Sequence, residues 1–134
     1  MKGVTMCKVV RTSEAPHPMG PYSQAIVADG FVFVAGQVPV NPSTNELELG
    51  DAGSETRRTL QNIKAILEAA GSSLRDVVRV GVFLADLKDF DAMNAVYREF
   101  FPEDPPARTT VGAQLPKIKV EIDCIARVRK RRKY

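Results

Sequence analysis

The sequence predicts an α+β fold in which two helices cover one face of a mixed β-sheet. Three observations favour this fold: a hairpin signal over residues 25–35, two stretches with helical spacing of apolar residues, and an alternating strand over residues 118–126. The expected element order is β-ββ-α-β-α-ββ. The 134 residues suit a single domain with one core. We place the core at about residues 8–127 and a basic tail at 128–134.

The first third of the chain is expected to hold three strands. A short strand over residues 7–11 precedes a loop, residues 12–24, whose prolines fix φ and remove backbone donors. Strands 25–28 and 31–35 flank Asp29-Gly30, a pair that favours the positive φ angles of a tight hairpin turn. The second of these strands is apolar throughout, so we expect both of its faces to be buried.

The first helix is predicted from about residue 52 to residue 70. Asp51 can cap its N-terminus and Gly71 can end it in a left-handed conformation. Apolar and small residues recur at steps of three and four along it, which places them on one face. That face contains Thr56, Leu60, Ile63, Leu67 and Ala70.

The second helix follows a β-branched strand over residues 77–84 and ends near Phe101. Asp86 or Asp89 can cap it, and Pro102 stops it. The same helical spacing predicts a buried stripe. That stripe contains Phe90, Met93, Tyr97 and Phe100.

The far face of the predicted sheet also needs a cover, because its strands are apolar on both sides. We predict that other copies of the chain cover it, since closed cyclic symmetry is the common solution for soluble oligomers. Three sheets closing around an axis would give a homotrimer with a central barrel-like core.

The charge of the chain is divided unevenly. Residues 127–134 hold six of the 19 basic residues and no acid, which leaves 13 basic against 16 acidic residues, a formal charge of −3, in residues 1–126. A short basic tail is usually a solvated end, the interpretation we favour. Such a tail can also pair with the phosphates of a nucleic acid.

Composition excludes several classes of protein. No apolar run approaches the ~20 residues that a membrane helix needs, and the N-terminus lacks the apolar region of a secretory signal. We therefore expect a cytoplasmic protein. One histidine, His17, and two distant cysteines do not form a zinc site. We expect no metal and no cofactor; a metal held by carboxylates alone stays open, although no Asp/Glu cluster has ligand spacing.

Arg108 is the first functional candidate. It lies among small and β-branched residues at the start of a strand, after a proline-rich break. Arginine is the best planar, bidentate partner for a small carboxylate. The following strand could bring Glu121 towards it. From the strand pattern alone, a structural ion pair of Arg108 with Glu121 or Asp123 is equally favoured.

Several short motifs occur together in a specific order. They are Gly20-Pro21-Tyr22-Ser23-Gln24-Ala25, Ala35-Gly36-Gln37-Val38-Pro39, residues 59–71, Asp89-Phe90 with Asn94 and Tyr97, Pro106-Ala107-Arg108, Leu115-Pro116-Lys117 and residues 120–126. Together they resemble the RidA/YjgF family of reactive-intermediate (enamine/imine) deaminases, whose older name is L-PSP endoribonucleases. The resemblance implies a chorismate-mutase-like subunit in a homotrimer, with sites in the clefts between subunits.

The resemblance also implies an activity: hydrolysis of reactive 2-imino acids, such as 2-iminopropanoate and 2-iminobutanoate, to 2-oxo acids and ammonia. Its catalytic positions fall on Arg108, Glu121 and Tyr22, and its further binding positions fall on Gly36, Thr110 and Asn94. Arg108 would hold the carboxylate, supported by backbone N–H groups near Gly36 and Thr110. Glu121, with Tyr22, would position a water and move protons, because an imine carbon needs orientation and proton transfer rather than a side-chain nucleophile.

Two other functions stay open. An endoribonuclease or translation inhibitor is an activity attributed to some relatives, and the basic tail is its independent support. A non-catalytic trimer that binds a small acid and regulates a partner is the second.

Overall fold

The computed structural model describes residues 7–129 and contains a six-stranded mixed sheet. Its strands are β1 (Lys8–Val10), β2 (Ala25–Ala28), β3 (Phe31–Gln37), β6 (Val77–Leu84), β7 (Ala107–Gly112) and β8 (Val120–Arg127). They are ordered β1-β2-β3-β8-β6-β7. β6 and β7 run parallel, and all other neighbours in this sheet are antiparallel.

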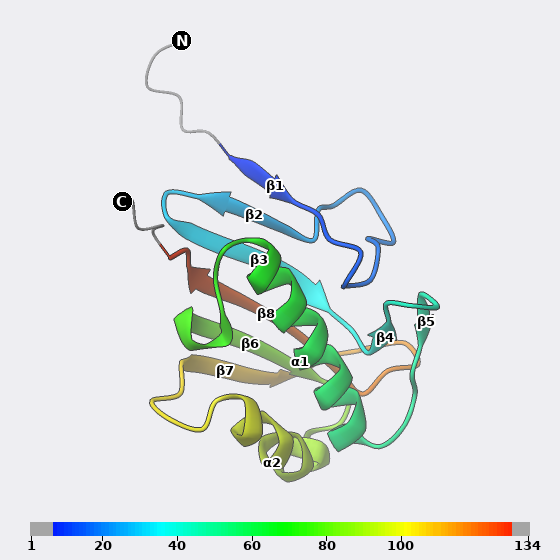
Figure 1. Ribbon diagram of the computed structural model, residues 1–134. Helices are drawn as coiled ribbons and strands as arrows, with labels where there is room; N and C mark the ends of the chain where they lie inside the picture. The colour runs from blue at the N-terminus through cyan, green and yellow to red at the C-terminus, as the bar shows by residue number, and fades with distance from the viewer. Residues whose placement is uncertain (1–6, 130–134) are drawn as a thin grey trace, which may run out of the picture.

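Both helices, α1 (Ala52–Ala69) and α2 (Phe90–Phe100), lie on the same side of the sheet (Figure 1). The predicted α+β class and the placement of the helices are therefore confirmed. One difference is a small hairpin of β4 (Val40–Asn41) and β5 (Glu46–Leu47), which the expected element order does not contain. Its two-residue strands are too short to give a period-2 pattern in the sequence.

The predicted signals at the β2–β3 turn and at both ends of α1 are confirmed, but the predicted cap of α2 is not formed. Asp29 and Gly30 adopt φ angles of 51° and 82° in the β2–β3 turn. The Asp51 side chain accepts a hydrogen bond from the Ser54 N–H at 2.8 Å and caps α1. Gly71 follows that helix with φ 82°. Asp89 precedes α2 without a side-chain cap, and Asp86 instead caps the short 3₁₀ turn before it.

The hydrophobic core lies between the helices and one face of the sheet. The predicted burial of β3 on both faces is wrong within a single chain. Val32 and Val34 are buried under α1, but Phe31 and Phe33 on the other face are 37% and 45% exposed. The helices cover only one face, and nothing in residues 7–129 covers the second. Phe90 also departs from the predicted stripe, being 41% exposed.

Three further points concern membrane spans, the cysteines and the basic tail. No helix within residues 7–129 combines the length and apolar character needed to cross a membrane. Cys7 is exposed and Cys124 is buried in the core, and both thiols are free. The basic tail beyond Arg129 lies outside the described residues.

Candidate functional site

Arg108 lies on the helix-covered face of the edge strand β7. It pairs in register with the buried Val80 of β6, so both side chains point towards the helices. Its guanidinium carbon is 4.6 Å from the ring centroid of Tyr97 and 5.6 Å from that of Phe90, both on α2. None of the ion pairs within residues 7–129 involves Arg108. The predicted structural ion pair is therefore not formed in one chain.

An open pocket of about 310 Å³ surrounds this arginine. Asn94, Tyr97, Phe101 and Pro106 line it together with Arg108. Thr110 lies two residues further along the same face of β7, and its buried side-chain hydroxyl has no hydrogen-bond partner in the described part of the chain. The predicted binding residues Arg108, Thr110 and Asn94 therefore come from one region, where α2 meets the sheet edge.

The backbone of β7 offers free donors beside Arg108. The Ala113 N–H donates to the Leu84 carbonyl at 2.9 Å, towards β6. Backbone groups alternate in direction along a strand, so the N–H groups of Arg108 and Thr110 point towards the outer edge. That edge has no neighbouring strand within residues 7–129. The Thr110 N–H therefore points outward, as it must if it is to support a bound carboxylate, the role predicted for it.

Gly36 and Glu121 form a second group on the uncovered face. The pairing of β3 with β8 shifts register between Val34 and Gln37, which leaves one extra residue on β3. Such bulges leave backbone groups unpaired and often lie beside active sites. A Cβ at Gly36 would collide with the Glu121 carboxylate. The glycine therefore makes room for the acid.

Partial burial affects the protonation of the Glu121 carboxyl. The pKa of its carboxyl is raised above the ordinary value, chiefly by burial and further by the nearby Asp123. A raised pKa brings a carboxyl closer to the pH at which it can both accept and donate a proton.

Tyr22 lies close to this second group, at the end of the ordered loop. It shares a small cavity of about 20 Å³ with Gly36. Its hydroxyl accepts a hydrogen bond from the Met19 N–H at 3.1 Å, which leaves the hydroxyl proton available. The buried Gln24 holds the loop by accepting from Thr12 N–H and donating to the Thr12 and Pro16 carbonyls at 2.8–3.0 Å.

The two groups do not meet within one chain. Glu121 pairs in register with Phe83, on the face opposite to that of Arg108. β6 lies between their strands, and the register separates them by three residues, so the two positions are roughly 10 Å apart across the sheet and about 10 Å along it. The expectation that β8 brings Glu121 towards Arg108 is therefore wrong for a single subunit.

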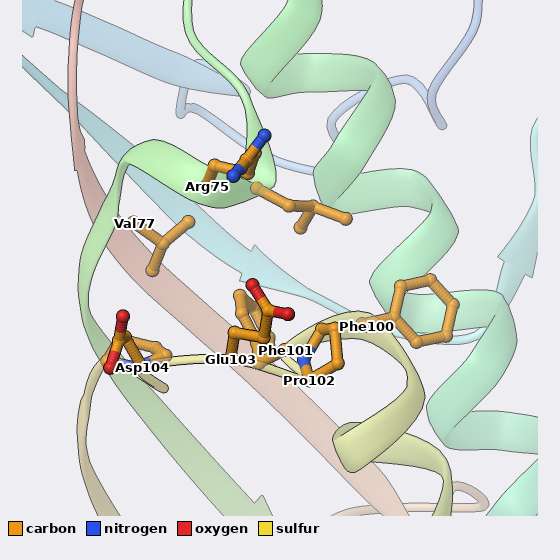
Figure 2. Close-up of a pocket in the computed structure, with 9 residues that line it drawn as sticks. Arg75, Val77, Phe100, Phe101, Pro102, Glu103 and Asp104 are labelled. Atoms are coloured by element: carbon orange, nitrogen blue, oxygen red, sulfur yellow. The ribbon is translucent and has the colours of Figure 1, made fainter.

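A larger pocket lies elsewhere, where the segment after α2 meets the 3₁₀ turn Leu74–Asp76. Its volume is about 500 Å³, and none of the predicted site residues lines it. Figure 2 shows the charged ends of Arg75, Glu103 and Asp104 around side chains that include Val77 and Pro102. Within residues 7–129, no three His, Cys, Asp or Glu side chains come together as a possible metal site.

Comparison with known proteins identifies the family. A family model described as Endoribonuclease L-PSP matches residues 12–128. The chain belongs to this family. The match confirms the resemblance that the motifs predicted, over nearly the same residues. The L-PSP fold is also found among solved structures: RidA from an Antarctic Psychrobacter has a TM-score of 0.86 at 41% identity, covering 90% of this chain and 99% of that one.

Two further members bear on function. A RutC family protein of Pyrococcus horikoshii is 54% identical over 90% of this chain and 98% of its own length. The 2-iminobutanoate/2-iminopropanoate deaminase of Escherichia coli is 44% identical, over 90% of this chain and 98% of its own length. L-PSP family membership is therefore shared by proteins with a general family name and by proteins with a named deaminase activity.

The sequence did not reveal the surroundings of Arg108, because helical spacing alone places Phe90 and Tyr97 in the core. The available signal is that both residues belong to the same motif as Asn94. Local periodicity does not predict the long-range contact between α2 and β7.

Proposed function

We propose that the protein hydrolyses 2-imino acids such as 2-iminopropanoate and 2-iminobutanoate to 2-oxo acids and ammonia. Arg108 carries this proposal. It lies in a pocket beside outward-pointing backbone N–H groups, and among residues 7–129 it has no acidic partner. That combination suits a small carboxylate. Support comes from the relative of 44% identity that is named as a deaminase for these compounds.

The reaction needs few groups from the protein. Arg108 and the Thr110 N–H bind the carboxylate and orient the imine carbon. Glu121 takes a proton from water as the oxygen adds to the carbon of the protonated imine, which gives a carbinolamine. It then returns this proton to the nitrogen; the C–N bond breaks as the carbonyl forms, and the remaining hydroxyl proton leaves with ammonia as ammonium. The raised pKa of Glu121 suits both transfers. Tyr22 and the bulge at Gly36 orient the water beside it.

The complete site lies between two copies of the chain. Asn94, Arg108 and Thr110 come from one subunit, while Tyr22, Gly36 and Glu121 come from its neighbour. The separation of these groups on opposite faces of one sheet supports this arrangement. The uncovered face exposes Phe31, Phe33 and Val111, an apolar surface that suits burial around the axis of a homotrimer.

A coupled assay tests the activity. A dehydratase generates 2-aminoacrylate from serine, or its homologue from threonine, and the release of 2-oxo acid is followed against the spontaneous reaction. The wild type should accelerate release and Arg108→Ala should not. Arg57→Ala is the matched control, because Arg57 only pairs with Glu99 on the surface. No acceleration by the wild type across several imino acids would exclude the proposal.

A further inference from the structure

The Arg108 guanidinium is partly buried and lies against two aromatic rings and a methionine sulfur of α2. Its carbon lies over the Tyr97 ring at 4.6 Å and over the Phe90 ring at 5.6 Å. Its Nη1 is also 3.9 Å from the Met93 sulfur. All three contacts come from one face of α2, and none comes from a carboxylate within residues 7–129.

This arrangement keeps the arginine available. An acidic neighbour would occupy the in-plane N–H donors, and a substrate carboxylate would have to displace it. An aromatic ring instead stabilises the cation through its face, which leaves the edge donors other than the Nη1 proton facing Met93 free for bidentate binding. The burial of Tyr97 strengthens the contact, because cation–π attraction increases when both groups lose water.

We propose that Phe90 and Tyr97 are positioning residues that form an aromatic clamp, which orients the Arg108 guanidinium for the substrate carboxylate. The inference rests on the proposed function and deepens it, since it assigns the strength of carboxylate recognition to two residues that do not touch the reacting atoms. The clamp acts on binding of the carboxylate and not on proton transfer.

If the clamp orients Arg108, loss of the Tyr97 ring should raise KM more than loss of the Phe90 ring. Tyr97→Leu removes the closer, buried ring and should raise KM for the imino acid about five- to thirtyfold. Phe90→Leu removes the more distant and more exposed ring and should raise KM about two- to fivefold. In both variants kcat should stay within about twofold of the wild type, because proton transfer at Glu121 is untouched.

Conservative variants separate the clamp from a general packing role. Tyr97→Phe keeps the ring and removes a hydroxyl that has no hydrogen-bond partner within residues 7–129, so its KM should match the wild type. Phe90→Tyr should do the same. Phe100→Leu is the control on the same helix, because Phe100 packs against the core without lying over Arg108. Phe90 is 41% exposed, so Phe90→Leu tests the clamp even if Tyr97→Leu fails to fold.

The experiment measures KM and kcat in the coupled assay, together with the Kd of 2-oxobutanoate by calorimetry. The Kd should rise by the same factor as KM. The Kd of the neutral amide of that acid should not change, because it carries no carboxylate. Unchanged KM and Kd in Phe90→Leu and Tyr97→Leu, or an equal loss in Tyr97→Phe, would overturn the clamp. A wild type that neither turns over imines nor binds 2-oxobutanoate would instead overturn the proposed function.

Discussion

The carboxylate of Glu121 lies against the backbone of Gly36, in the space that any side chain at that position would need. The two residues come from neighbouring strands, and the β3 bulge brings the glycine beside the acid. The absence of a side chain at position 36 therefore fixes where the acid of the proposed site can lie.

Gly36→Ala should lower activity far more than stability. The added methyl group meets the end of a flexible side chain, so Glu121 moves and the free energy of unfolding changes by less than about 1 kcal/mol. A displaced acid should lower kcat about a hundredfold. The control is Gly112→Ala, whose Cβ has only ordinary contacts with Leu87. Full activity in Gly36→Ala would show that kcat does not depend on where the Glu121 carboxylate lies.

Glu121→Gln should stabilise the fold while removing activity. Burial raises the pKa of Glu121 above its ordinary value of 4.5, so the folded chain binds this proton more tightly than the unfolded chain. The wild type therefore loses stability as pH rises from 4.5 through the raised pKa, whereas glutamine does not titrate.

The unfolding midpoint of Glu121→Gln should accordingly exceed that of the wild type at pH 7–8, and the difference should disappear below the ordinary carboxyl pKa of about 4.5. Thermal unfolding across this pH range measures it, with the exposed Glu14→Gln as the control. If the midpoints of the two proteins differ by the same amount at every pH, burial does not raise the pKa of Glu121.

Glu55 should stabilise the folded chain, because it is a fully buried acid that accepts hydrogen bonds from two backbone N–H groups. Its two oxygens accept the N–H groups of Lys119 at 2.7 Å and Gly50 at 3.1 Å. Glu55→Ala leaves both donors unsatisfied and should cost about 2–4 kcal/mol in urea unfolding. Glu55→Gln keeps one acceptor and should cost less. Equal losses in the two variants would show that packing, not hydrogen bonding, sets the effect.

A deletion that tests the basic tail should begin at Lys130 and keep Arg129. Arg129 donates to the buried Asp76 carboxylate at 3.0 Å. Deleting residues 130–134 should leave imine hydrolysis unchanged and weaken any binding of RNA, measured by anisotropy at two salt concentrations. Loss of imine hydrolysis on this deletion would tie the tail to the site and contradict the account.

Local signals predicted most of the fold and singled out Arg108, whereas the other candidate site residues came from the family resemblance. Asp29-Gly30 predicted the hairpin, and Asp51 with Gly71 predicted the limits of α1, because each acts through its own backbone. The relation of Arg108 to Glu121 could not be predicted in this way. It depends on β6 lying between β7 and β8, and strand order is set by long-range packing. The contacts of Phe90 and Tyr97 with Arg108 were missed for the same reason.

The most direct test mixes two inactive variants. Arg108→Ala and Glu121→Gln are each expected to be inactive in the coupled assay. If each site takes Arg108 from one subunit and Glu121 from its neighbour, random mixed oligomers from equal amounts should regain about a quarter of wild-type activity. The two variants must be unfolded and refolded together, with separately refolded samples mixed afterwards as the control. No recovery in oligomers shown to contain both chains would contradict a site built between subunits.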